Sequence, residues 1–112
     1  MTVTATNLIP SKLAENAQTT QYTSIDAKTI IDTFTGTNNT AGNVTLSINL
    51  VALGGAAGAA NLVVPTRTIA PGETYRFDEI IGQVLENGGF ISTIASAAAS
   101  IVIRASGRVI TT

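Results

Sequence analysis

The acidic residues are the side chains of this sequence with the most catalytic potential, because two other reactive types are missing. The chain has no histidine, the usual general base, and no cysteine, the usual strong nucleophile. Without cysteine it also has no disulfide framework and no thiolate zinc site. Two convergent carboxylates could still act as general acid and base. The candidates are Asp26, Asp32, Glu73, Asp78, Glu79 and Glu86.

The local sequence suggests structural roles for three of these acids. Asp78 and Glu79 precede an apolar stripe with helical spacing, and acids are favoured at a helix N-cap and in its first turn. Asp32 lies midway between Ile30 and Phe34, so strict alternation would turn it inward with them. We expect a hydrogen-bonded or edge-facing Asp32. The sequence therefore predicts no catalytic residue, no metal site, no cofactor and no enzyme activity.

Three further patterns could suggest binding sites, and each has a simpler explanation. The glycine-rich residues 54–60 lack the Gly-Lys-Ser/Thr ending of a phosphate-binding loop and lead into a predicted strand. The triplets at residues 38–40 and 43–45 match the N-glycosylation pattern, but no secretory signal precedes them. Sugar-binding sandwiches stack rings on exposed aromatics, whereas the two Tyr and three Phe of this chain are few enough to be used in a core.

The elements that must position all these side chains are predicted to be strands. Val44, Leu46, Ile48 and Leu50 alternate with polar residues, which is the period of a half-buried antiparallel strand. About eight strands in total indicate an all-β protein, a jelly-roll-like or Greek-key antiparallel β-sandwich. The other predicted strands cover residues 18–24, 28–37, 61–70, 73–77, 90–96 and 100–110.

Proline and glycine mark the boundaries of these strands. Pro65 removes a ladder donor and places its strand at an edge or a bulge. Pro71 and Gly72 fit the central positions of a type II turn. The apolar stripe of residues 78–86 predicts one short helix, closed by Asn87 and Gly88. Residues 106–107, Ser-Gly, predict a bulge or a tight turn.

The chain is predicted to form one domain with a distinct start. Residues 1–20 read as a Thr-rich N-terminal arm, interrupted at Pro10, with Ser11 capping a short helical turn. The arm could belong to the sandwich or contact partners. Residues 21–112 are predicted to form a single β-sandwich, which is long enough to bury a core without metals or disulfides.

Charge and hydropathy limit the classes of partner. Six basic and seven acidic residues give a net charge of −1, and no basic cluster is present, so we expect no nucleic-acid binding. No run approaches 18 apolar residues and no signal peptide is visible, so we expect no membrane association and synthesis in a cytoplasm. Only 12% of residues are charged, which suits a protein that lives in an assembly.

A few apolar residues do not fit an obvious core face. Apolar side chains on both faces of a strand imply burial on both sides, within the domain or against a partner. Combined with the low charge, this pattern makes these residues candidates for partner contact. They are Val3, Leu8, Ile9, Val51, Leu53 and Val63.

The order of several segments resembles that of a known group of proteins. These segments are residues 29–35 with the following Asn-rich turn, residues 44–51, residues 69–75, and residues 81–85 running into 89–94. In this order the chain resembles the small capsid decoration proteins, also called cement or staple proteins, of short-tailed bacteriophages.

The resemblance implies a structural virion protein with a jelly-roll-like fold. Such a protein would bind the outer surface of an assembled capsid, bridge neighbouring major capsid subunits, and self-associate as a dimer or trimer on the shell. It would be made in the bacterial host cytoplasm. The alternatives are a carbohydrate- or receptor-binding sandwich of a tail or fibre, and a head-to-tail connector component.

Overall fold

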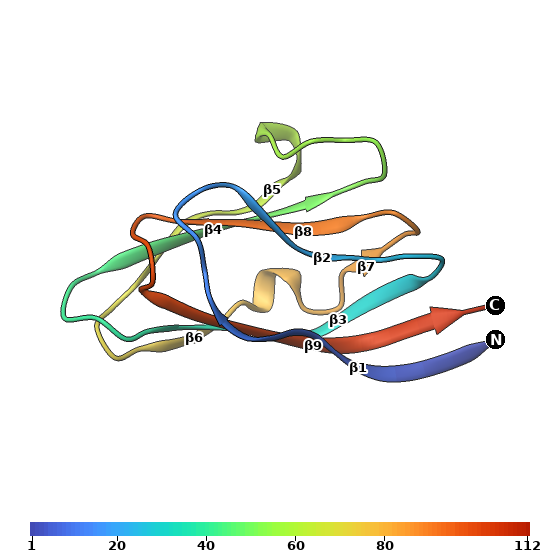
Figure 1. Ribbon diagram of the computed structural model, residues 1–112, viewed down its shortest axis with the longest axis horizontal. Helices are drawn as coiled ribbons and strands as arrows, with labels where there is room; N and C mark the ends of the chain where they lie inside the picture. The colour runs from blue at the N-terminus through green and yellow to red at the C-terminus, as the bar shows by residue number, and fades with distance from the viewer.

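The computed structural model describes all residues from 1 to 112 as nine strands in two sheets (Figure 1). The molecule measures 46 × 27 × 20 Å. Two single 3-10 turns, η1 (Ala59–Asn61) and η2 (Asp78–Ile80), are its only helical segments, and neither could cross a membrane. The strands are β1 (Thr2–Leu13), β2 (Thr19–Thr23), β3 (Lys28–Asn38), β4 (Val44–Val51), β5 (Leu62–Ile69), β6 (Thr74–Arg76), β7 (Val84–Leu85), β8 (Phe90–Ala95) and β9 (Ile101–Thr111).

The strand pairing is that of a jelly roll. Four antiparallel pairs are nested in the sequence: β1 with β9, β2 with β8, β3 with β6, and β4 with β5. Folding this nested hairpin over gives one sheet in the order β1-β9-β3-β6, with β7 also on β3, and a second in the order β2-β8-β4-β5. The predicted all-β antiparallel sandwich is therefore confirmed, with nine strands where about eight were expected.

The two sheets enclose one apolar core of 18 buried residues. Phe34 and Phe77 are fully buried, and their rings meet edge to face with centroids 5.4 Å apart. Leu46 and Ile48 contribute from β4 as the alternation predicted. Between the sheets, η2 carries the buried Ile80 into the same core.

The predicted helix at residues 78–86 is wrong. Only the η2 turn forms; then Gly82 adopts a positive φ of 85° and the chain extends into β7. The N–H of Gly82 donates to the carbonyl of Ile31 (2.7 Å), and the N–H of Ile31 donates to the carbonyl of Gln83 (3.0 Å). β6 pairs only with residues 35–37 of β3, so the start of β3 has a free edge on that side. Pairing with this edge satisfies the backbone groups of residues 82–85, and tertiary contacts therefore override a local helical pattern.

Residues 1–20 are not a free arm, because most of them form a sheet strand. β1 pairs with β9 from Thr2 to Leu13 and runs through Pro10, and Ser11 lies within the strand instead of capping a helical turn. The register shifts between Thr6 and Ile9 and again between Ile9 and Lys12. These bulges accommodate the proline without ending the strand.

A bulge also corrects the predicted faces of β3. The register with β9 shifts between Ile31 and Thr33, and this irregularity changes the alternation. Thr29 and Ile31 are buried before the bulge and Phe34 after it. Asp32 therefore points outward, although strict alternation from Ile30 to Phe34 turned it inward.

The predictions from proline and glycine in the middle of the chain are confirmed. β5 is an edge strand, and its register with β4 shifts around Pro65, where Thr66 has a φ of 36°. Gly72 has a φ of 74°, and the N–H of Glu73 donates to the carbonyl of Ala70 (3.0 Å) across the turn at Pro71. Residues 106–107 form no tight turn and lie within β9; Gly107 lies opposite bulges whose extra residues belong to β1 and β3.

Candidate interaction surface

Three of the six candidate contact residues are buried within the chain. Leu8 and Ile9 are 5% and 1% exposed, because the β1 bulge turns both of these neighbours toward the core. Val51 is 1% exposed because the following loop folds back over it, with the N–H of Gly55 donating to the carbonyl of Ala52 (2.9 Å). In this fold, none of the three can reach a partner.

The remaining candidates divide between packing and exposure. Val63 is partly buried and packs against the core. Val3 is 50% exposed near the chain start, and Leu53 is 73% exposed on the loop after β4. Only Val3 and Leu53 therefore remain as accessible apolar candidates from the sequence.

The candidate catalytic acids are dispersed, and most have a structural partner. Asp32 accepts two-pronged hydrogen bonds from Arg108 (2.9–3.2 Å) on the outer face of the sheet, and these bonds raise the pKa of Arg108. Glu73 accepts from the N–H of Ala70 in the turn. The other pairs are Arg76 with Asp78 (3.2 Å), Tyr75 with Glu79 (3.3 Å) and Lys28 with Glu86 (3.6 Å), while Asp26 lies in the β2–β3 loop.

Three exposed apolar side chains belong instead to elements at the end of the sandwich where both chain termini lie (Figure 1). We call this region the termini end, and we call the side chains of Ile25, Leu53 and Val84 its apolar tips. These side chains are 73%, 73% and 49% exposed. They come from the β2–β3 loop, the loop after β4 and β7, respectively. Exposed apolar side chains on neighbouring loops are candidates for contact with a partner.

Backbone contacts bring the loops of the termini end together. The N–H of Ser24 donates to the carbonyl of Gly89 (2.8 Å), and the N–H of Gly88 donates to the carbonyl of Ser24 (2.7 Å). The N–H of Asp26, which has a φ of 52°, donates to Oδ1 of Asn87 (2.8 Å). Leu53 packs directly on Gly88, leaving no room there for a Cβ. The exposed tips are thus held in place by the rest of the fold.

Beside the tips lies an open hollow of about 170 Å³. Its lining includes Leu50, Val51, Val84 and Leu85. This volume is below the range of sites for small organic ligands. Sequence reasoning missed Ile25 and Val84; an apolar residue between the turn residues Ser24 and Asp26 was the available signal for the first.

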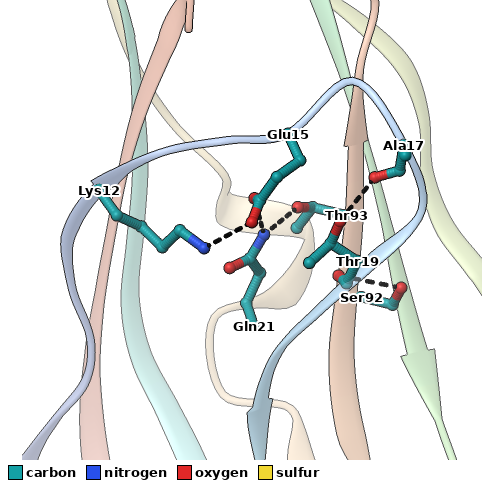
Figure 2. A network of polar contacts seen from close by, with 7 residues as sticks. All are labelled: Lys12, Glu15, Ala17, Thr19, Gln21, Ser92 and Thr93. Atoms are coloured by element: carbon teal, nitrogen blue, oxygen red, sulfur yellow. Dashed lines mark hydrogen bonds and ion pairs between the residues drawn. The ribbon is translucent and has the colours of Figure 1, made fainter. Parts of the chain in front are cut away.

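A polar network fixes the crossing from β1 to β2 (Figure 2). Glu15 accepts from Nε2 of Gln21 (2.9 Å) and from Nζ of Lys12 (3.0 Å), and Gln21 also donates to Thr93 on β8 (3.0 Å). The N–H of Ala95 donates to the backbone carbonyl of Glu15 (3.0 Å). The network therefore joins the crossover to the second sheet.

The network makes stability depend on pH through Glu15. Hydrogen bonds from Gln21, then Lys12, lower the pKa of Glu15 below its ordinary value. A carboxyl with a lowered folded-state pKa adds stability above the unfolded pKa and loses it as the pH falls. Because the side chain is 41% exposed, we expect Glu15→Gln to cost less than about 1 kcal/mol at pH near 7.

Urea unfolding at neutral pH and below pH of about 4 tests this prediction. The difference between wild type and Glu15→Gln should shrink as the pH falls through the lowered folded-state pKa of Glu15. Glu86→Gln is the matched control, since Glu86 is 70% exposed beside Lys28. A cost of Glu15→Gln that stays the same at both pH values would contradict the role of its charge.

The fold and the surface define an all-β sandwich whose most distinctive accessible feature is an apolar end. No family model, no curated protein and no solved structure matches this chain.

Proposed function

We propose that this chain is a structural virion protein that binds the outer surface of an assembled phage capsid and stabilises it by bridging neighbouring major capsid subunits. The observation that carries the proposal is the termini end, where Ile25, Leu53 and Val84 are exposed together on interlocked loops. The resemblance of the sequence to capsid decoration proteins supplies the kind of partner.

The surface chemistry of the chain supports a role in an assembly. Only 12% of its residues are charged, and the one ion pair near the apolar tips, between Lys28 and Glu86, is open to solvent. Interface cores are depleted in charge, whereas their rims are polar. At the termini end, the exposed Lys28 and Glu86 lie close in the sequence to the apolar Ile25 and Val84.

Bridging explains how a small apolar patch can stabilise a shell. A protein that contacts two neighbouring subunits binds the second at a high local concentration once the first contact has formed. Both contacts exist only while the lattice is intact. The binding free energy therefore opposes expansion or loss of subunits.

Substitutions at the apolar tips test this function. We expect Leu53→Asp combined with Ile25→Asp to weaken saturable binding to emptied capsids at least about tenfold, since two apolar contacts would be replaced by desolvated charges. The matched control is Leu62→Asp, at the start of β5 and 39% exposed. Binding is measured by co-sedimentation with shells that lack the protein.

Electron microscopy gives the second measurement. Virions without this gene product should lose density from the outer capsid surface. Unchanged capsid density, or wild-type binding by the double variant, would contradict the proposal. Specific hits on a glycan array, with no binding to shells, would favour the receptor-binding alternative.

A further inference from the structure

The free edges of the two sheets differ in their protection against pairing with another chain. β5 has Pro65, a bulge and Arg67, and β6, β7 and β2 are at most five residues long. β1 has 12 residues, and its only charge is Lys12 near the far end. Sheet edges are usually protected by proline, bulges, charges or short length. Residues 2–6 of β1 have none of these.

The direction of the backbone groups on β1 follows from hydrogen bonds two strands away. Successive residues of a strand point their N–H and C=O groups to opposite sides. Ile31 donates to Gln83 and accepts from Gly82, so its groups face β7. The groups of the preceding residue, Ile30, must then face β9.

The same alternation carries across β9 to the free edge. Ile30 pairs with Arg108, so the groups of Arg108 face β3 and those of Val109 face β1. Val109 pairs with Thr4, and Thr4 therefore bonds to β9. The neighbours Val3 and Ala5 turn their N–H and C=O groups outward, away from the protein.

The pattern of residue types around Thr4 is symmetric, with Thr at positions 2, 4 and 6 and a small apolar residue at positions 3 and 5. Residues 2–6 read Thr-Val-Thr-Ala-Thr, so in a two-fold antiparallel pairing centred on Thr4 each residue i faces residue 8 − i of the second copy. Val3 faces Ala5, Thr2 faces Thr6, and Thr4 faces itself. Cross-strand Thr–Thr pairs and small apolar pairs are favourable, and no like charges meet.

We propose that two copies of this chain pair antiparallel through residues 2–6 of β1 about a two-fold axis at Thr4. The outward groups of Val3 and Ala5 then form a hydrogen-bonded pair on each side of the axis. The regular register of β1 ends after Thr6, and the alternation of Thr with small apolar residues also ends there. The β1-β9-β3-β6 sheets of the two copies then form one continuous sheet, in which β1 of one copy lies beside β1 of the other. This inference does not depend on the capsid role.

Removing one outward donor tests the pairing. Sedimentation velocity of the wild-type chain should show a concentration-dependent shift from 11.4 kDa to twice that mass. Ala5→Pro deletes an N–H that faces away from β9, and should raise the dimer dissociation constant about 100-fold. Ala5→Val retains the N–H and should leave the dimer intact. A dimer unaffected by Ala5→Pro would overturn the proposal.

A charge exchange at the axis tests the register. Thr4→Lys and Thr4→Glu each place like charges opposite one another and should be monomers, whereas an equal mixture of the two should form a heterodimer. Thr20→Lys on β2, a similar exposed position of the other sheet, is the control and should dimerise as wild type. A wild-type chain that stays monomeric up to millimolar concentration, or a mixture that stays monomeric, would overturn the proposal.

Discussion

Replacing Gly107 with alanine should lower the free energy of unfolding by about 3 kcal/mol. A Cβ at this position would overlap the carbonyl oxygen of Ile30 and lie 3.0 Å from Cδ1 of Leu8. The carbonyl oxygen belongs to the neighbouring strand β3 and cannot rotate away as a side-chain tip can. Relief therefore requires β3 and β9 to separate locally, which weakens the central pairing of the sheet.

Gly42→Ala is the matched control for this prediction. A Cβ at Gly42 meets no atom within 4 Å, so its cost should stay within about 0.5 kcal/mol of zero. Urea unfolding of both variants measures the difference. Equal stability of Gly107→Ala and wild type would show that the two strands lie farther apart than described.

Replacing Phe77 with alanine should lower the free energy of unfolding by about 4 kcal/mol. Phe77 is fully buried, and its ring meets Phe34 at 5.4 Å and Tyr75 at 4.8 Å, both edge to face. It also packs over Gly36 of β3. Its removal would leave a large cavity between the sheets and end two aromatic contacts at once.

Phe77→Leu separates loss of volume from loss of the aromatic ring. It should cost about 1.5 kcal/mol, because most of the buried volume remains. Phe90→Ala, at a partly exposed position, should also cost less than Phe77→Ala. Because the chain has no tryptophan, circular dichroism is used to follow unfolding by denaturant. Similar costs for Phe77→Ala and Phe77→Leu would contradict a close-packed site.

The fold class was predictable because it rests on patterns that repeat along the chain. The alternation of residues 44–48 and the turn at Pro71 and Gly72 depend only on neighbouring residues. Pro65 could be assigned to an edge or bulge because its missing N–H excludes a central position. Each of these features is local, so one sequence is sufficient to recognise it.

The errors come from contacts between distant segments. The residues around Gly82 form a strand because β3 offers an edge there, and no local pattern shows that edge. Asp32 faces outward because a bulge opposite Gly107 changes the alternation of β3. Leu8 and Ile9 are buried for the same kind of reason, since a bulge in β1 turns both inward.

The candidate surface was less predictable than the fold. Leu53 was found as an apolar residue without a core position, but Ile25 and Val84 join it only through the folded arrangement of three loops. Val51 had the same apolar character as Leu53, yet the next loop covers it. A surface made from separate loops has no signature in any one segment of sequence.

The pairing of β1 with β9 has a consequence for the timing of folding in the cell. Thr2 lies opposite Thr111, so β1 cannot find its neighbour until β9 has also been synthesised. Nested pairing of this kind makes folding slow relative to chains with local contacts. Until then, the uncharged Thr-rich segment is open on both sides and available to chaperones or to other nascent copies.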